Sequence, residues 1–346
     1  MYTTMLQLLL RTLGSAAVIA LLVACCADAT GDTKPVAPLS GGAAGVVDTL
    51  YQTSEAPPSE LTGYRRWWSS LWPVASPINL PEADDRKMHY GYTEYNGPAT
   101  WSLEYPICGG NHQSPVDLSS NRMLRASGTP LRWSAAYWHT PDNMTLMNSG
   151  HTVELHANWG AEGAPQLSGG PLRAPYTFWQ MHFHWGTSDN HGSEHTINNA
   201  SFPMEVHAVH YKSEYGSPRN ALRYPDGLAV VGFLFQMSPD ASSSLTNITP
   251  SLPQVRSAGS SSRIPPVPLA TIINPPRAYA TYQGSLTTPP CSEGVTWMVS
   301  GYSMSVSTEQ LAAFRSLASH DGSMGDNFRP VQPLNGREIF YVSQSS

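Results

Sequence analysis

Charged residues are scarce in this chain, and basic residues are scarcer than acidic ones. Only 13% of the 346 residues are charged, and 25 Asp and Glu against 19 Lys and Arg give a formal net charge of −6. Proteins that bind nucleic acids rely on a surplus of basic side chains, so this balance gives no support for a nucleic-acid partner. The sequence also lacks a His-Glu-x-x-His motif, so nothing in it indicates a zinc peptidase.

Long hydrophobic runs are lacking too, except for one near the N-terminus. The run Thr12–Ala24 follows Arg11 and is shorter than the roughly 20 residues that a transmembrane helix needs. Because the small-x-small site Ala27-Asp28-Ala29 comes next, we expect residues 1–29 to be a signal peptide and the protein to be secreted or to enter the secretory-pathway lumen. Two alternatives stay open. An uncleaved signal anchor would bring the protein into contact with a membrane, and Leu22-Val23-Ala24-Cys25 resembles a bacterial lipobox.

Cysteines are few. The chain has four, of which Cys25 and Cys26 belong to the predicted signal peptide. The other two, Cys108 and Cys291, are an even number, which suits an oxidising compartment. Asn-x-Ser/Thr sequons agree with export and predict a glycoprotein; they begin at Asn143, Asn199 and Asn247.

Turn-forming residues, in contrast, are abundant. The chain has 30 prolines and 28 glycines, which is typical of a mainly β protein with many connections. Residues 30–85 are rich in Pro, Gly, Ser and Ala, so we expect a low-complexity linker or N-terminal extension there. Within it, the aromatic and basic patch at residues 64–72 has two open interpretations, contact with a membrane interface or packing on the domain's own surface. We expect a single domain over residues 86–343.

Strand-length runs dominate this expected domain. They are Met144–Met147, Thr152–His156, Thr177–Trp185, Met204–Tyr211, Leu228–Met237 and Val295–Ser300. Two segments look helical, Arg219–Tyr224 and Glu309–Ser319, the second capped by Ser307 or Thr308. The Ser- and Pro-rich residues 238–268 predict a long surface loop or an insertion, with Leu245 as its internal anchor. The pattern therefore predicts a mainly β (α+β) fold with short peripheral helices.

Two of these runs carry histidines in strand spacing. Side chains two residues apart share one face of a strand, so Gln180, His182 and His184 lie on one side of the first run. The same rule places Glu205 and His207 together on the second run. If the two strands pair, three imidazoles can hold a zinc ion and leave its fourth position open, as catalytic sites do. Gln180 and Glu205 would fix the tautomers of the ligands. The alternative is a set of core histidines with incidental neighbours.

Longer motifs make the chain resemble the α-class carbonic anhydrases, of the secreted eukaryotic type with one disulfide, from about His89 to Val342. The matching motifs are Tyr90-Gly91-Tyr92, Gln113-Ser114-Pro115-Val116, Gln180 to Trp185, Gly192-Ser193-Glu194-His195, Tyr282 to Pro290 and Asn327 to Leu334. This resemblance implies a large, twisted, mostly antiparallel central sheet. It also implies a zinc lyase that reversibly hydrates CO2 to bicarbonate and a proton, with Zn²⁺ bound by His182, His184 and His207.

The resemblance also assigns roles around that zinc ion. Thr287 and Glu194 would orient a zinc-bound hydroxide for attack on CO2. His151 would be the proton shuttle, and Tyr92 would complete an ordered-water network. By family position, the substrate pocket would be formed by Val209, Val230, Leu286, Thr288, Val295 and Trp297.

Further features follow from the same resemblance. It implies a disulfide between Cys108 and Cys291, and inhibition by sulfonamides or anions that bind the zinc. Ser149 and Glu154 depart from the residues common in the family along the expected water path, which puts the rate of proton transfer in question. The alternative function is a catalytically silent carbonic-anhydrase-like binding or adhesion module. Such modules usually lack a zinc histidine, and here all three are present.

Overall fold

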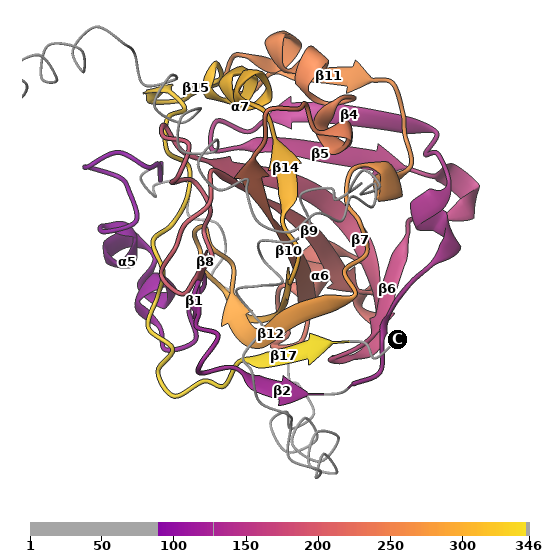
Figure 1. The fold of residues 1–346 in the computed structure, drawn as a ribbon, viewed down its shortest axis with the longest axis vertical. Helices are drawn as coiled ribbons and strands as arrows, with labels where there is room; N and C mark the ends of the chain where they lie inside the picture. The colour runs from indigo at the N-terminus through magenta and orange to yellow at the C-terminus, as the bar shows by residue number, and fades with distance from the viewer. Residues whose placement is uncertain (1–88, 127, 344–346) are drawn as a thin grey trace, which may run out of the picture. The chain divides into compact units, whose positions relative to one another are not determined.

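The computed structural model describes residues 89–126 and 128–343, and within them the protein is mainly β (Figure 1). The predictions for the signal peptide, the linker and the aromatic patch fall outside these described residues. In the part that the structure describes, no helix is long and apolar enough to cross a lipid bilayer.

The strands lie along the whole described range. They are β1 (Asp117–Leu118), β2 (Leu124–Ala126), β3 (Leu131–Trp133), β4 (Asn143–Asn148), β5 (Val153–Asn158), β6 (Gln166–Gly169), β7 (Leu172–Trp185), β8 (Thr196–Ile197), β9 (Met204–Lys212), β10 (Leu228–Met237), β11 (Ser261–Ile264), β12 (Ala278–Ser285), β13 (Glu293–Ser300), β14 (Met304–Val306), β15 (Ala318–Ser319), β16 (Gly322–Ser323) and β17 (Phe340–Ser343).

The helices are short. The α-helices are α5 (Trp101–Glu104), α6 (Pro218–Ala221) and α7 (Thr308–Arg315). The 3-10 helices are η1 (Pro106–Gly109), η2 (Ala135–Trp138), η3 (Gly160–Glu162), η4 (Ser213–Tyr215), η5 (Ser243–Leu245), η6 (Thr249–Val255) and η7 (Leu269–Thr271).

One large mixed sheet organises the domain. Its 13 strands follow the main order β11-β4-β5-β7-β9-β10-β13-β12-β17-β2. Off this order, β14 pairs with β10, β6 pairs with β7, and β3 pairs with β6. Most neighbours are antiparallel, but β10 and β13 pair in parallel, as do β17 and β2. Strand β10 is central and nearly fully buried, which explains its uninterrupted hydrophobic sequence. The expected fold is therefore confirmed, with a sheet that is mixed rather than purely antiparallel.

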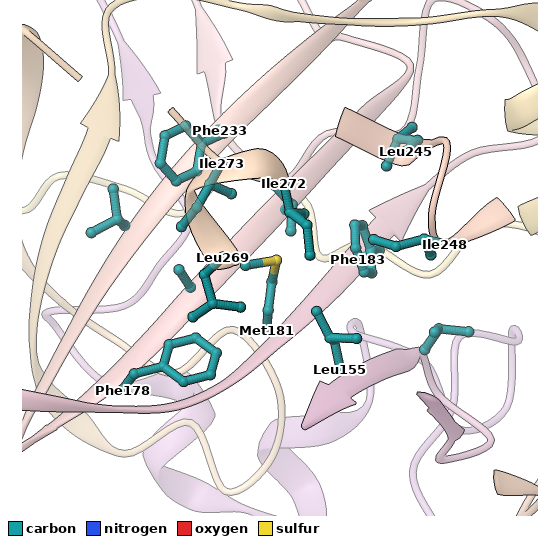
Figure 2. Packing of buried hydrophobic residues seen from close by; sticks show 14 of the residues in the cluster. Leu155, Phe178, Met181, Phe183, Phe233, Leu245, Ile248, Leu269, Ile272 and Ile273 are labelled. Carbon is teal, nitrogen blue, oxygen red and sulfur yellow. The ribbon is translucent and has the colours of Figure 1, made fainter. Parts of the chain in front are cut away.

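The two faces of the central strands have different tasks. On β7, Met181, Phe183 and Trp185 are fully buried in the larger apolar core, which also holds Leu155 and Phe233 (Figure 2). The residues that alternate with them point to the opposite face and include the predicted zinc ligands. Strand alternation thus uses one face to stabilise the domain and leaves the other for chemistry.

Predicted and observed elements agree closely. All six predicted runs are strands, most of them one to five residues longer than expected. Helix α7 begins after Ser307, whose hydroxyl accepts the Gln310 N–H in a capping box. It ends at Arg315 rather than at the expected Ser319, because Ala318 and Ser319 form β15 instead.

The prediction of a long surface loop over residues 238–268 is wrong. This segment forms η5 and η6 and then β11, which pairs antiparallel with β4. Its apolar residues reach into the larger core and are fully or nearly fully buried, namely Leu245, Ile248, Leu252, Val255 and Ile264. Leu245 is an anchor, as expected, but one of several (Figure 2). Serine and proline are so frequent in residues 238–268 that the spacing of the few buried apolar residues is hard to see in the sequence.

The predicted disulfide is present. Cys108 in η1 is bonded to Cys291 in the connection between β12 and β13, across 183 residues of sequence. The peptide bonds Ser114–Pro115 and Pro289–Pro290 are cis.

The burial of Leu245 in the larger core predicts that segment 238–268 contributes to stability. We expect Leu245→Ala to lower the free energy of unfolding by about 2–5 kcal/mol, because it opens a cavity in a closed core. Ser243→Ala in the same 3-10 helix is the matched control, since Ser243 is exposed and its loss should change stability by no more than about 0.5 kcal/mol. Urea denaturation measures both. Equal effects of the two substitutions would show that this segment is a surface loop after all.

Candidate metal centre

Three histidines converge on the face of the sheet opposite the larger core. The antiparallel pairing of β7 and β9 sets His182 directly opposite His207, and His184 follows two residues along on the same face. One ring nitrogen from each of the three lies within 4.8 Å of those of the others. Their ring centroids are 4.6–5.1 Å apart.

The outer nitrogen of each ring has an acceptor as its partner, and this contact fixes the tautomer. The contacts are His182 Nδ1 with Gln180 Oε1 at 3.0 Å, His184 Nδ1 with the Asn327 carbonyl at 2.8 Å, and His207 Nε2 with Glu205 Oε1 at 2.8 Å. Because these oxygens accept, each ring places its N–H outward. The inner nitrogens are left with lone pairs and no proton. Gln180 and Glu205 thus make the contacts expected from their spacing.

Such a set of inner lone pairs fits a cation. His182 Nε2 and His207 Nδ1 are only 3.2 Å apart, so two lone pairs face each other. His184 Nε2 is buried and has no hydrogen-bond partner. Burial lowers the pKa of His182 and of His184, which favours the neutral imidazoles that bind metals. Zn²⁺ accepts three imidazole nitrogens and keeps a fourth position for a reactant, so the donor set suits it.

Glu205 connects this centre to the interior. Its carboxylate is fully buried, and Oε1 accepts from His195 Nδ1 at 2.7 Å as well as from His207. Oε2 accepts the backbone N–H groups of Glu194 at 2.9 Å and His195 at 2.8 Å. Burial alone would raise the pKa of Glu205, but the imidazoles of His195 and His207 outweigh it, and the pKa lies well below its usual range. The residue is therefore a carboxylate at neutral pH.

Glu194 presents a free carboxylate oxygen to the metal centre. Its Oε1 accepts the N–H of Arg329 at 2.9 Å. Its Oε2 is buried without a hydrogen bond, 3.5 Å from His184 Nε2 and 3.9 Å from His207 Nδ1. Among the residues that the structure describes, no hydrogen bond joins Glu194 to Thr287, although Thr287 is also buried. The role expected for this pair therefore stays a prediction.

An apolar wall stands beside the histidines. It consists of residues from β9, β10 and β13 that are at most 3% exposed, namely Val209, Val230, Val295 and Trp297. The Trp297 ring lies 4.8 Å from that of His207, and its indole N–H donates to the Ser285 carbonyl at 2.9 Å. Leu286 packs against this cluster, whereas Thr288 is half-buried and its carbonyl accepts the N–H of Cys291. The predicted pocket residues thus lie on one smaller apolar cluster, with Thr288 at its edge.

Asn327 is a positioning residue to which the sequence assigned no role. Its Oδ1 accepts the N–H of Trp185 at 2.7 Å, and its backbone carbonyl accepts from His184. Its Nδ2 donates to the carbonyls of Phe183 and His151, both at 3.1 Å. One buried side chain therefore holds the ligand strand and the turn of the predicted shuttle together. In the sequence, Asn327 is noticeable only as the first residue of the motif Asn327 to Leu334, and that motif does not predict these contacts.

Arg329 has a similar role near the disulfide. Its guanidinium is buried and donates to Gln113 Oε1, the Ser114 carbonyl and the Cys108 carbonyl at 2.8–2.9 Å. Its backbone N–H holds Glu194. The disulfide fastens the segment before β1 to the loop that carries Thr287, and Arg329 fastens the same segment to Glu194.

The predicted shuttle lies in the turn between β4 and β5. His151 is half-buried, and its ring stacks on Tyr90 with the centroids 4.0 Å apart and the planes 10° apart. Burial, reinforced by His89 and His320, lowers the pKa of His151 to about 4. Tyr92 is half-buried and meets Trp101 edge-on at 5.6 Å. Burial raises the pKa of Tyr92 well above its usual value, so its phenol keeps its proton.

The partner of His182 provides a test of this centre. We expect Gln180→Ala to weaken Zn²⁺ binding by about tenfold, at the low end of the roughly 10–100-fold typical for residues that orient metal-bound histidines. Gln283→Ala is the matched control, because Gln283 is also a half-buried strand glutamine but pairs with Thr296. Competition with a chromophoric chelator measures the affinity. Unchanged affinity in Gln180→Ala would show that the tautomer of His182 is fixed in another way.

Comparison with known proteins agrees with this geometry. The family model described as "Eukaryotic-type carbonic anhydrase" matches residues 96–343. The chain is similar to carbonic anhydrase 7 from Mus musculus and to carbonic anhydrase 7 from Homo sapiens. Each is 39% identical over 257 residues, which is 72% of this chain and 96% of the relative. The match spans the three histidines, the buried carboxylates behind them and the apolar wall beside them, and the chain belongs to the eukaryotic-type carbonic anhydrase family.

Proposed function

We propose that this protein catalyses the reversible hydration of CO2 to bicarbonate and a proton, with Zn²⁺ held by His182, His184 and His207. The observation that carries the proposal is the convergence of three unprotonated ring nitrogens beside an apolar wall. Membership of the carbonic anhydrase family supports the same activity. A zinc ion held there supplies hydroxide at neutral pH by lowering the pKa of water, an effect for which carbonic anhydrase is itself the reference example.

The apolar wall binds the substrate. CO2 has no charge and no hydrogen-bond donor, so Val209, Val230 and Trp297 can hold it without leaving a polar group unpaired. These side chains also exclude water from the reacting carbon. Bicarbonate, in contrast, carries a charge that this wall cannot stabilise, and the product therefore leaves readily.

Thr287 and Glu194 orient the reactants. The free Oε2 of Glu194 can accept the hydroxyl proton of Thr287 after a rotation of that side chain. The threonine oxygen can then only accept a hydrogen bond on the side of the metal centre. Thr287 would thus accept a hydrogen bond from the attacking oxygen and leave a lone pair of that oxygen directed towards CO2. This positioning lowers the entropy cost of the reaction.

Proton export falls to His151. Each turnover in the hydration direction releases one proton inside a partly closed site, and a positioned imidazole can carry it towards solvent. Tyr92 keeps its own proton and thus serves as a hydrogen-bonding partner for water rather than as a base. The alternative of a silent binding module is not favoured, because every residue that holds the metal is in place.

We also infer that the protein is exported, with residues 1–29 removed as a signal peptide. The disulfide between Cys108 and Cys291 supports this inference, since such bonds persist in oxidising compartments. Among the sequons, Asn143 and Asn199 are exposed and can accept a glycan. An uncleaved N-terminal anchor is the alternative, and it would place the enzyme at a membrane.

The proposed activity has a direct test. We expect the zinc-loaded protein to hydrate CO2 in a stopped-flow assay and to be inhibited by sulfonamides or small anions that bind Zn²⁺. His207→Ala should bring the rate to that of the uncatalysed reaction, because two histidines cannot hold the metal tightly. His112→Ala is the control, since His112 is exposed and outside the metal centre. Full activity in protein from which a chelator has removed all metal would refute the proposal.

Location has a separate test. Mass spectrometry of the protein made in its own secreting cells should show a mature chain that begins near residue 30, with glycans at Asn143 and Asn199. A chain that retains residues 1–29 and stays with the membrane fraction would instead establish the anchor.

A further inference from the structure

Three histidines form a second cluster at the rim of the domain, outside the metal centre. His89 lies 4.7 Å from His151 and 4.7 Å from His320, between ring centroids, and His151 lies 5.8 Å from His320. They come from three separate places in the chain, namely the segment before α5, the β4–β5 turn and the β15–β16 turn. We call His89, His151 and His320 the rim cluster.

The rim cluster has a fixed inner member and two exposed outer members. His151 is half-buried and stacks on Tyr90, and its backbone carbonyl is held by Asn327. His89 and His320 are exposed. His320 is positioned as well, because its Nε2 lies 3.2 Å from the Ser149 carbonyl, and an N–H at this nitrogen donates to it. The half-buried ring of His151 thus lies directly beside two rings that are exposed to solvent.

The three rings are close enough to affect one another electrostatically. Imidazoles this close repel one another when more than one is charged, so the group favours holding one proton at a time. Burial and the two neighbouring histidines lower the pKa of His151, while the carboxylate of Asp321 opposes this effect. Tyr90 and Glu154 are the other titratable groups on this side of the cluster, and burial keeps Tyr90 in its neutral form. A proton on His151 is therefore poorly stabilised, and the exposed rings of His89 and His320 lie close enough to receive it.

We propose that the rim cluster is a proton relay, in which His151 takes the proton from the metal centre and passes it to His89 or His320. The proposal rests on the CO2 hydration proposed above. An O–H bond of water in the site breaks as an N–H bond forms on His151. That N–H bond then breaks as one forms on an outer ring, directly or through a water molecule, and a buffer base takes the proton last. No group changes its oxidation state.

This relay explains how a half-buried histidine can serve as the shuttle. A ring that holds a proton poorly returns it to the site unless another base lies within reach. His89 and His320 are such bases, and each is exposed to buffer. The relay therefore keeps His151 neutral and ready for the next turnover.

The test compares kcat with kcat/KM for CO2 hydration in weak and in strong imidazole-type buffer. We expect the double variant His89→Ala/His320→Ala to lower kcat in weak buffer by about tenfold, a part of the roughly 10²–10⁴ that a positioned proton acceptor contributes. Strong buffer should restore kcat, and kcat/KM should not change. His151→Ala should lower kcat in weak buffer at least as much.

Two further variants separate proton transfer from packing. In the double variant His89→Ala/His320→Gln, the glutamine can still donate to the Ser149 carbonyl but cannot carry a proton, so this variant should lower kcat in weak buffer just as His89→Ala/His320→Ala does. His139→Ala is the matched control, because His139 is another exposed histidine beside an acidic residue, Glu162, and lies outside the cluster. It should leave kcat unchanged.

Three outcomes would overturn the relay. Unchanged kcat in the double variant would show that buffer takes the proton from His151 itself. A raised kcat would show that the outer histidines only hinder His151. A parallel fall in kcat and kcat/KM would place the effect at the metal centre. Failure of the proposed function looks different, because the wild-type protein would then show no zinc-dependent kcat/KM at all.

Discussion

The antiparallel register between β7 and β9 is the constraint on which the rest of this structure depends. It sets His182 opposite His207 and puts both on the same side of the sheet as His184. A slip by one residue would turn every ligand towards the larger core and every core residue towards the site. The fully buried Met181 and Phe183 oppose such a slip, since their exposure would cost apolar burial along the whole strand. Core packing and metal geometry are thus set by a single pairing.

The buried carboxylate of Glu205 makes the candidate metal centre rigid. Glu205 accepts four hydrogen bonds and has no exposed surface, so it loses little by leaving water. Removing any one donor would leave part of a buried carboxylate without a partner, which is costly in a medium of low dielectric. The carboxylate of Glu205 therefore holds both His207, a predicted metal ligand, and the backbone around Glu194. This coupling makes the inner centre rigid while the rim remains open to water.

The sequence predicted those features that depend on short spacing. A period of two placed Gln180 beside His182 and Glu205 beside His207. The hydrophobic runs located most of the long strands but missed β12, which lies inside the central sheet. Sequence patterns failed where contacts join distant segments. Two examples are the hydrogen bond of His184 to the Asn327 carbonyl and the contact of His89 with His320. Both bring together turns that are far apart in the sequence, and no short sequence pattern predicts such contacts. Residues 238–268 were misjudged for another reason, because their serines and prolines outnumber the few buried residues that decide their structure.

Asn327 contacts both the candidate metal centre and the turn that carries the predicted shuttle. Its carbonyl orients a metal ligand while its amide holds the backbone of His151. A substitution of Asn327 would therefore disturb the predicted metal ligand and the predicted shuttle together. In the part of the chain that the structure describes, no hydrogen bond joins Asn327 to His89 or His320. The outer end of the proposed relay can thus be altered while the residue that orients His184 stays in place.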